Sequence, residues 1–524
     1  MAAEERRHLP DDRPTRYADR VGAGIVANKP AGQRKTGGLY LTPVDVADFM
    51  AAQVSAGRSS VRILDPAAGS GTLLCAVVER LAAGDARFRN ADLTAYETDP
   101  DLHNALVAVL GNLKRWAARH HIAVRVRIEA SDFVLAHAQF LGASGHLFRS
   151  DRIQPYDLVI ANPPYFKIPK CDPRAQAATS VVHGQPNIYA LFMAAGAALL
   201  CEGGEFLFIT PRSFTSGPYF RLFRQRFFAS VRPTGVHVFG SRREAFGRDE
   251  VLQENIILKG VREDGWQQRG GRFKLCISSS AGLADLHDPA LRWLPLEDAL
   301  AQSTDKVLRL PILRGEDEAV RFVDSWTGSL HGYGMNISTG PVVPFRAEEF
   351  LDEGGRPADT YAPLIWMSHV HAMRVSFPNG GRKPQYIKRG ASERSLLLPN
   401  RNYVLLRRFT AKEEPRRLVA GPWFKRSSSC PLLGIENHLN YIYRPAGELD
   451  EEEARGLAAL LNSELLDTYF RVSSGNTQVS ATELRAMPLP PRDKIILIGR
   501  RAKALNDRGQ ELDDLVEEVI GLAR

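Results

Sequence analysis

The chain has 524 residues, 44% of them hydrophobic, which suffices for compact cores and excludes a globally disordered protein. Its formal net charge of +8 is compatible with a polyanionic partner. Five scattered cysteines without close pairs exclude a zinc ribbon and disfavour a disulfide framework. Because the sequence has no apolar run of membrane-spanning length and no signal-peptide pattern, we expect a soluble intracellular protein without a membrane partner.

The first segment, residues 1–34, is polar and rich in Arg, Asp and Pro, so we expect a loosely ordered arm. A glycine-containing segment, Gly37-Gly-Leu-Tyr-Leu-Thr-Pro43, follows it and leads into a predicted helix over residues 44–52. Thr42 before Pro43 has the pattern of a helix N-cap with proline at the first helical position.

Residues 61–65 predict a strand, and the loop Asp65-Pro-Ala-Ala-Gly-Ser-Gly-Thr72 then enters a helix. Glycines let a backbone approach a ligand closely, and the helix N-terminus offers free N–H groups. A Gly-x-Gly loop alone is a weak signal that fits several nucleotide folds, but the absence of a Gly-Lys-Ser/Thr run disfavours a P-loop. The acid Asp65 at the strand end favours a ligand that is cationic or carries an amino group.

Acids also follow two later strands. The strand at 92–97 ends at Glu97, roughly 25 residues past the glycine loop, where a carboxylate can bond the two ribose hydroxyls of a nucleoside. The strand at 124–128 leads to Asp132 and Phe133, which can accept from an adenine amino group and pack on the purine. Taken singly, each of these features also fits an ordinary solvated strand end or turn.

The stretch Leu158-Val-Ile-Ala-Asn-Pro-Pro-Tyr165 carries the most specific signal. Its apolar residues predict a buried strand, and two prolines, which have no N–H, leave a rigid extended turn. Asn162 offers a planar amide and Tyr165 a flat aromatic face, so the turn suits a planar substrate with an exocyclic amino group. The amide oxygen and a proline carbonyl can accept the two amino hydrogens while the ring stacks on the tyrosine. A plain strand-ending Asn-Pro turn is the alternative interpretation.

Alternating elements continue to about residue 258, with predicted helices at 187–200 and 219–228 and strands at 205–210, 235–239 and 255–258. The predicted fold class is therefore α/β, an open, doubly wound, Rossmann-like sheet whose ligand crevice lies at the carboxyl ends of the strands. All of the motifs described above lie at such strand ends.

The basicity of the chain is local. Residues 371–426 contain 14 Lys and Arg against three Glu, a net charge of +11, whereas the whole chain has +8. Aromatic residues are interleaved with these charges, so we expect a nucleic-acid-facing groove, with a solvated charged surface as the alternative. This half of the chain is predicted to be mixed, with a β-like run at 403–406, a helix at 451–466 and a helical tail after residue 490.

In this order, the motifs resemble those of the adenine-N6 DNA methyltransferases. The glycine-Thr-Pro segment precedes the Asp65 loop, and a large basic region follows the Asn-Pro-Pro-Tyr motif, an order that resembles the gamma class. Three later segments look like those of the PstI/BsuBI group of type II modification methylases: Asn402-Tyr-Val-Leu-Leu-Arg-Arg-Phe409, Glu436-Asn-His-Leu-Asn-Tyr441 and Ser474-Gly-Asn-Thr-Gln-Val-Ser480.

The resemblance implies a role for each motif residue. S-adenosyl-L-methionine would be the cofactor, and no metal is expected. Its methionine end would be held by Thr42, Asp65, Ala67 and Gly69, its ribose by Glu97, and its adenine by Asp132, Phe133 and Phe192. The catalytic residues would be Asn162, Pro163 and Pro164 around the target N6, with Tyr165 and Phe246 stacking on the two faces of an adenine flipped out of duplex DNA.

The pattern along the chain and the resemblance together predict a domain organisation: an N-terminal arm (1–34), a catalytic methyltransferase domain (35–262), a connector (263–300), a mixed α+β DNA target-recognition domain (301–490) and a helical tail (491–524). Phosphate contacts are expected from Arg407, Arg408, Arg416 and Arg417, and base readout from Asn476 and Gln478. The PstI/BsuBI likeness would make CTGCAG the target. The partners would be double-stranded DNA and a separately acting restriction endonuclease, in the bacterial cytoplasm at the nucleoid.

Three alternatives remain open at this point. The Asn-Pro-Pro-Tyr turn also suits the side-chain amide of a protein glutamine, although such an enzyme would not need a basic C-terminal region of this size. An RNA adenine methyltransferase would be distinguished by comparing RNA with duplex DNA as methyl acceptors. A non-enzymatic DNA-binding specificity subunit would not bind S-adenosylmethionine.

Overall fold

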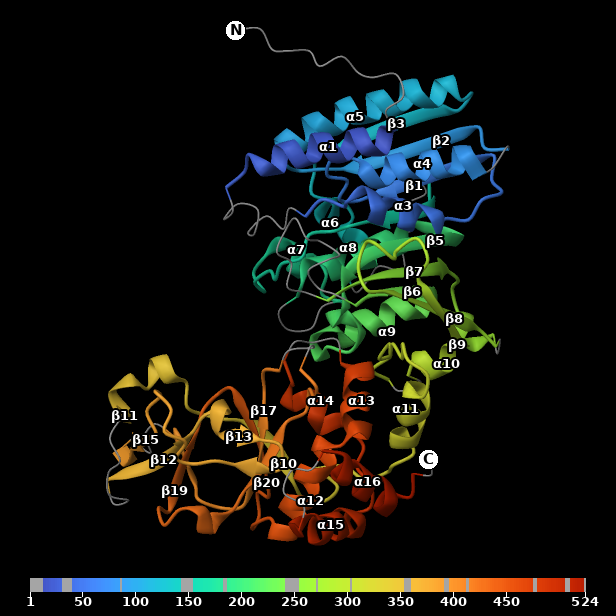
Figure 1. The fold of residues 1–524 in the computed structure, drawn as a ribbon. Helices are drawn as coiled ribbons and strands as arrows, with labels where there is room; N and C mark the ends of the chain where they lie inside the picture. Colours follow the sequence, from blue (N-terminus) through green and yellow to red (C-terminus); the bar gives the residue numbers. More distant parts are fainter. Residues whose placement is uncertain are drawn as a thin grey trace. The chain divides into compact units, whose positions relative to one another are not determined.

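A computed structural model describes most of the chain, and Figure 1 shows its ribbon. The described residues are 13–30, 40–84, 87–142, 154–181, 186–240, 254–269, 272–301, 304–352, 360–390, 395–410, 414–474, 478–504 and 509–522. The chain forms two compact units, Met1–Ile312 and Leu313–Arg524, each with hydrophobic clusters of its own.

The first unit is built on a nine-stranded sheet with the order β3-β2-β1-β4-β5-β7-β6-β8-β9. In that order the strands are β3 (Ala123–Glu129), β2 (Asn90–Tyr96), β1 (Ser60–Asp65), β4 (Tyr156–Ala161), β5 (Leu200–Pro211), β7 (Asn255–Arg262), β6 (Val231–Phe239), β8 (Lys274–Ser280) and β9 (Ala290–Pro295). The first five run parallel, whereas β7 is antiparallel to both of its neighbours. Because parallel strands end on the same side of a sheet, the loops after β1, β2, β3 and β4 meet there.

Helices cover both faces of this sheet (Figure 1). One face carries α1 (Pro14–Ala27), α3 (Val44–Ala52), α4 (Thr72–Gly84) and α5 (Pro100–Arg119), and the other carries α6 (Phe133–Ala136), α7 (Pro173–Ala177), α8 (Ile188–Leu199) and α9 (Arg221–Ser230). Side chains alternate across a strand, so Ile63 packs into the core beneath α4 while Leu64 packs into the core around α8. The predicted doubly wound α/β fold is confirmed.

The first difference from the sequence prediction is α1, which lies inside the segment expected to be a loose arm. The composition of that segment is polar, but its buried residues recur at helical spacing: Pro14, Thr15, Ala18, Gly22 and Val26. The guanidinium of Arg13, just before the helix, donates to Asp48 (3.0 Å) and Glu79 (2.7 Å). A narrow apolar stripe and these ion pairs therefore dock the segment on α3 and α4.

The second difference concerns residues 263–300, which were expected to be a connector. They contain β8 and β9, which extend the sheet beyond β6, followed by the short helix α10 (Leu296–Ala299). Leu275 and Ile277 of β8 are buried in the core of the unit, whereas β9 is mostly exposed and has only a weak apolar pattern. The first unit consequently ends at Ile312.

The second unit combines small sheets with helices. The four-stranded antiparallel sheet has the order β10 (Asn336–Thr339), β20 (Leu439–Tyr443), β17 (Tyr403–Arg407) and β18 (Ala420–Trp423). The five-stranded mixed sheet has the order β11 (Leu351–Asp352), β15 (Tyr386–Lys388), β12 (Tyr361–Ile365), β19 (Leu432–Ile435) and β16 (Leu397–Pro399), and β13 (Val370–His371) pairs with β14 (Arg374–Val375). The helices are α11 (Glu316–Asp324), α12 (Glu451–Asn462), α13 (Glu464–Ser473), α14 (Ala481–Ala486), α15 (Arg492–Arg501) and α16 (Gly509–Ile520).

The helix predicted at 451–466 is divided into α12 and α13. Ser463 between them has an extended backbone, and its hydroxyl accepts the backbone N–H of Leu466 as the N-cap of α13. Across the described residues, none of the helices combines the length and the apolar character that crossing a membrane requires.

Candidate active site

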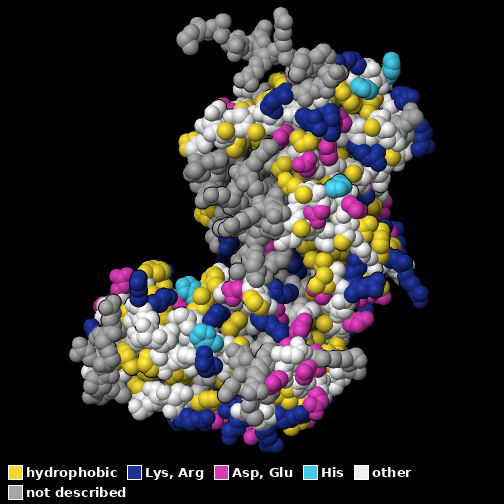
Figure 2. All heavy atoms as spheres, viewed as in Figure 1, with side chains coloured by type: hydrophobic (Ala, Val, Ile, Leu, Met, Phe, Trp, Pro, Cys, Tyr) yellow, Lys and Arg dark blue, Asp and Glu magenta, His cyan; other side chains and the backbone are white. Residues whose placement is uncertain are grey.

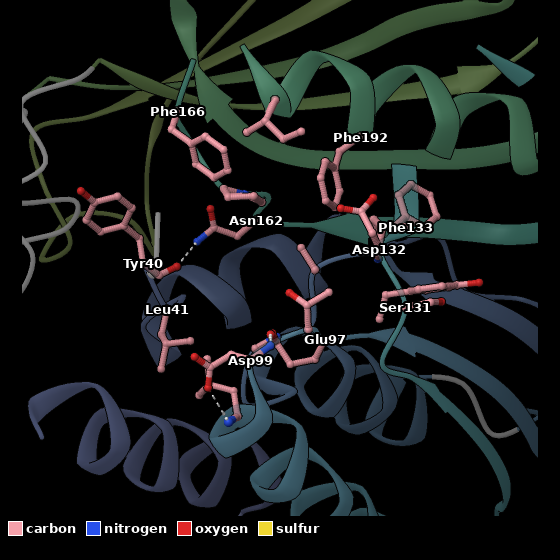
Figure 3. A pocket seen from close by; sticks show the side chains of 18 of the residues that line it. Tyr40, Leu41, Glu97, Asp99, Ser131, Asp132, Phe133, Asn162, Phe166 and Phe192 are labelled. Carbon is pink, nitrogen blue, oxygen red and sulfur yellow. Dashed lines mark hydrogen bonds between the residues drawn. The ribbon is translucent and has the colours of Figure 1, made fainter. Parts of the chain in front are cut away.

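A cavity of about 550 Å³ opens at the carboxyl ends of β1, β2, β3 and β4 (Figure 3). Its walls come from the loops after these strands, from the segment before α3 and from α8. They include most of the residues predicted for the cofactor and the target: Ala67, Gly69, Glu97, Asp132, Phe133, Asn162, Pro164 and Phe192. Motifs that are far apart in the sequence therefore converge on one site.

The loop after β1 is tied to the end of β2. Glu97 accepts hydrogen bonds from the backbone N–H groups of Gly69 (2.9 Å) and Asp99 (2.7 Å), so each of its oxygens is fixed. Gly69 has φ +54°, a left-handed backbone conformation that favours glycine, and a Cβ there would come within 2.8 Å of the end of the Leu41 side chain. Burial raises the pKa of Glu97. A carboxylate oriented in this way at the cavity wall keeps lone pairs for further hydroxyl donors.

Asp65, at the end of β1, is fully buried and is not among the residues that line the cavity. One of its oxygens accepts from the N–H of Ala67 (3.1 Å), and the other has no hydrogen-bond partner among the described residues. Burial, together with the nearby Glu97, raises the pKa of Asp65 to about 7. A buried carboxylate oxygen without a partner is unfavourable, so a donor that reached it would be bound favourably.

Aromatic rings form another wall of the cavity. Phe133 and Phe192 lie with their ring centroids 5.4 Å apart, and Tyr96 meets Phe133 edge-on at 5.2 Å. Asp132 caps α6 by accepting a backbone N–H (2.9 Å), and its second oxygen lies 3.6 Å from Arg174. An apolar slot beside a carboxylate suits a flat heterocycle with an amino group.

Asn162, directly after β4, is held by three groups. Its Nδ2 donates to the carbonyl of Tyr40 (3.0 Å) and to the hydroxyl of Thr42 (3.2 Å), and its Oδ1 accepts from the hydroxyl of Tyr165. Both amide N–H bonds are thereby used, so the side chain cannot turn over without losing them. Figure 3 shows Asn162 at the cavity with its bond to Tyr40. The amide oxygen is consequently fixed in direction, with one lone pair left for another donor.

The two hydroxyl residues around Asn162 have surroundings that the sequence did not indicate. Thr42 is 6% exposed, and it does not cap α3, whose N-cap is Pro43, so the capping prediction is wrong. Tyr165 is 7% exposed, its hydroxyl also lies 2.9 Å from a carbonyl of β5, and its ring stacks on Tyr40 at 6.3 Å. Neither residue lines the cavity. Cofactor contact by Thr42 and base stacking by Tyr165 stay predictions.

Sequence reasoning missed several lining residues, among them Lys29, Tyr40, Phe166 and Arg174. Phe166 directly follows the Asn-Pro-Pro-Tyr motif and Tyr40 lies within the glycine-Thr-Pro segment, so adjacency to a motif was the available signal.

Pro163 is buried and does not line the cavity. Phe246, predicted to stack on the target base, lies outside the described residues.

The arginines predicted to contact phosphate have unequal surroundings in the second unit. Arg417 is 3% exposed, its Nε donates to the hydroxyl of Thr410 (3.2 Å), and its guanidinium lies over the Phe470 ring. Arg416 pairs with Asp513 at 2.5 Å. The predicted phosphate contact of Arg417 does not fit its burial, because its guanidinium packs on α13 and leaves almost no surface for DNA.

Arg407 and Arg408 are half-buried and use part of their donors within the protein. Arg407 donates to the carbonyl of Val370 (2.7 Å), and Arg408 donates to the carbonyl of Asn437 (3.1 Å) and to Oε1 of Gln478 (3.3 Å). A guanidinium has five N–H donors, so each arginine keeps donors for an outside acceptor.

The other features predicted for DNA binding are a base-reading loop and a local basic surface. The contact between Arg408 and Gln478 brings two of the predicted DNA-binding residues together, whereas Asn476 lies outside the described residues. On the face shown in Figure 2, Lys and Arg side chains of the second unit are interspersed with Asp and Glu.

Comparison with known proteins identifies families and relatives that the chain resembles. A family model described as Eco57I restriction-modification methylase matches residues 122–246, and one described as N-6 DNA Methylase matches residues 24–178. The chain is 34% identical to the type II methyltransferase M.BsuBI of Bacillus subtilis, over 92% of this chain and 94% of that protein. It is 32% identical to the type II methyltransferase M.PstI of Providencia stuartii, over 93% of each chain.

A likeness also extends to a solved structure. The cryo-EM structure of a DrdV–DNA complex has a similar fold, with a TM-score of 0.50 and 12% sequence identity, over 94% of this chain and 59% of that chain. The region matched by the N-6 DNA Methylase model contains the glycine loop, Glu97 and the Asn-Pro-Pro-Tyr turn, and the two curated relatives cover almost the whole chain. The chain therefore belongs to the family of type II methyltransferases that includes M.BsuBI and M.PstI, and it is an adenine-specific DNA methyltransferase.

Proposed function

We propose that the enzyme transfers the methyl group of S-adenosyl-L-methionine to N6 of an adenine flipped out of duplex DNA, within the sequence CTGCAG. It would act in the bacterial cytoplasm as the modification enzyme of a restriction-modification system, beside a separate endonuclease of the same specificity. The observation that carries the proposal is the amide of Asn162, which is held at the cavity by Tyr40, Thr42 and Tyr165 with its oxygen as acceptor.

The side chains at the cavity fit this cofactor. Three acids and two bases line the cavity, a balance that favours a cation, and the unpartnered oxygen of Asp65 lies at the end of β1. The carboxylate of Glu97 suits the ribose hydroxyls, and the slot between Phe133 and Phe192 suits a purine. When bound, S-adenosylmethionine supplies an electrophilic methyl group on a positively charged sulfur.

The protein's part in the reaction is to prepare the adenine amino group. That nitrogen is a poor nucleophile because its lone pair is delocalised into the ring. In the proposed complex, Oδ1 of Asn162 and the carbonyl of Pro163 accept the two amino hydrogens, which localises the lone pair on nitrogen. Because Tyr40, Thr42 and Tyr165 hold the amide of Asn162 in place, little reorganisation is needed when the base arrives.

The target base must leave the helix before it can reach these acceptors. Extruding a base costs a few kcal/mol, and an aromatic face at the site offsets part of that cost. We assign this stacking to Tyr165, whose ring would have to become accessible from its present 7% exposure.

Sequencing of DNA from a host that expresses the enzyme tests the activity and the target separately. Single-molecule sequencing should detect N6-methyladenine at one recurrent sequence, and none should be found in a host expressing Asn162→Ala. If DNA from the host that expresses the wild-type enzyme contains no N6-methyladenine at a recurrent sequence, the proposed activity is overturned. The same DNA should resist PstI, and complete cleavage with N6-methyladenine present elsewhere would overturn the CTGCAG assignment alone.

A further inference from the structure

Lys29, from the segment that the sequence predicted to be a loose arm, lines the active-site cavity and has no part in the proposed chemistry. Its Nζ donates to the carboxylates of Asp99 (2.6 Å) and Asp101 (3.0 Å), and its side chain is 14% exposed. The hydrogen bond to Asp99 raises the pKa of Lys29, so the ammonium stays charged at neutral pH. Lysine side chains usually lie in water, so a charged lysine that is largely covered here indicates a role beyond solubility.

Helix α1 sets the position of this ammonium. The helix packs on α4 and α5, and near its start the backbone N–H of Thr15 donates to the buried carboxylate of Glu79 (2.8 Å). Just after its end, the N–H of Lys29 donates to the carbonyl of Val26 (3.1 Å). Lys29 therefore reaches Asp99 from a helix that is anchored on the core of the unit.

Asp99 connects Lys29 to the acid that we assign to the cofactor ribose. Oδ1 of Asp99 caps α5 by accepting the backbone N–H groups of Asp101 and Leu102 (3.1 Å each). Oδ2 of Asp99 accepts from Lys29. The backbone N–H of Asp99 donates to Oε1 of Glu97 (2.7 Å), and Figure 3 shows these two acids at the same wall of the cavity. Lys29 therefore holds a residue that orients Glu97.

The ion pair also balances charge at this wall. Glu97, Asp99 and Asp101 are close in the sequence, and like charges at short range repel one another. Burial raises the pKa of Glu97, and the nearby charge of Asp99 adds to this effect. Without the ammonium of Lys29, repulsion would disfavour both the present position of Asp99 and the ionised form of Glu97, which is the stronger acceptor for hydroxyl groups.

We propose that Lys29 is a positioning residue for the cofactor ribose: by holding Asp99, it fixes the carboxylate of Glu97 in the direction of the two ribose hydroxyls. This inference rests on the proposed function, which supplies S-adenosyl-L-methionine as the ligand of the cavity. An ion pair that only fastened α1 would change the melting temperature of the protein and leave its recognition of ribose as it is. Recognition of the hydroxyls therefore separates the two roles.

Calorimetry with S-adenosylhomocysteine and its 2′-deoxy and 3′-deoxy analogues measures that recognition. For the wild-type protein, loss of a hydroxyl should raise the dissociation constant about tenfold or more, because Glu97 loses a hydrogen bond to a charged group. For Lys29→Met the same loss should cost about threefold or less, because a displaced carboxylate binds the hydroxyls poorly. Equal penalties in the two proteins for both analogues would overturn the proposal.

Asp99→Asn tests whether Lys29 acts through Asp99. Asparagine can keep the N-cap of α5, but it removes the charge that pairs with Lys29. This variant should show the reduced penalty of Lys29→Met, and the double variant should bind S-adenosylhomocysteine no more weakly than the weaker single variant. Losses that multiply in the double variant would mean that Lys29 contacts the cofactor directly, which would overturn the positioning role.

Two controls are matched to Lys29→Met. Lys29→Arg keeps a cation and should keep the wild-type penalty, and Lys114→Met, which removes an exposed lysine of α5, should keep it as well. Thermal melting checks that each variant is folded, and Lys29→Gln replaces Lys29→Met if the latter is not.

Failure of the proposed function would look different. A wild-type protein that does not bind S-adenosylhomocysteine would contradict the cofactor itself. A wild-type protein that binds it without discriminating against either deoxy analogue would contradict the ribose contact of Glu97, and this inference with it. Discrimination that is unchanged in Lys29→Met would remove only the role of Lys29.

Discussion

The two units of the protein differ in the kind of side chain that is predicted to bind or catalyse. In the first unit the predicted residues that the structure describes are neutral or acidic and buried or half-buried, and Asn162 is held by hydrogen bonds to Tyr40 and Thr42. In the second unit arginines are numerous, yet many are used within the protein. Arg444 and Arg492 both bond Glu453, which is 0% exposed, and Arg417 is itself buried.

The two units show that two kinds of sequence signal differ in what they can predict. Motifs at the ends of parallel strands locate individual residues, because the strands fix where the following loops lie. A local excess of Lys and Arg shows that a region is positively charged, but it does not show which of these side chains face solvent. Substitutions of single residues in each unit test this difference.

The largest effect is expected in the first unit, from Asn162→Ala. We expect kcat to fall about 100-fold or more, as for loss of a preorganised transition-state contact, while the dissociation constant for S-adenosylmethionine changes less than twofold. Single-turnover methylation and calorimetry measure the two quantities. A variant with wild-type kcat would contradict the role given to the amide.

Asp65 should give the next effect, as a pH dependence of cofactor affinity. Its pKa is raised to about 7, so in the free protein it is protonated below that pH and ionised above it. If its free oxygen meets a cationic group of the cofactor, binding favours the ionised form, and affinity should fall about tenfold from pH 8 to pH 6. Calorimetry from pH 6 to pH 8 should show that the dissociation constant for the cofactor depends less on pH in Asp65→Asn than in the wild-type protein. An equal pH dependence in both proteins would show that Asp65 does not contact the cofactor.

A smaller effect should separate two roles for Thr42. Thr42→Val removes the acceptor of an Asn162 N–H, so we expect kcat to fall about fivefold at saturating DNA and cofactor, with KM values little changed. Thr42→Ser keeps the hydroxyl and should retain most of the wild-type kcat. A loss of S-adenosylmethionine affinity with unchanged kcat would instead support the cofactor contact that the sequence predicted.

Thr42 also illustrates how much of the site the sequence could reveal. The first four strands, the glycine loop and the cavity residues Glu97 and Asn162 follow from local patterns, and the structure brings Glu97 and Asn162 to one cavity. The acceptors of the two Asn162 amide N–H groups, Tyr40 and Thr42, could not be predicted, because they lie 122 and 120 residues away and no local pattern pairs them with Asn162. The same limit applies to the fold, where α1 was obscured by its polar composition and β9 by its exposure.

The smallest effect is expected in the second unit and compares Arg407 with Arg417. Arg407 is half-buried and keeps free donors, so Arg407→Gln should weaken binding to all DNA sequences alike, about threefold, and lower the magnitude of the salt slope by ~0.9. Arg417→Met should leave the salt slope unchanged and lower the melting temperature, because Arg417 contributes to packing against Phe470. Binding titrations at several salt concentrations and thermal melting measure both quantities. A reduced salt slope in Arg417→Met would mean that this side chain reaches phosphate despite its burial, and composition would then predict DNA contacts better than the structure does.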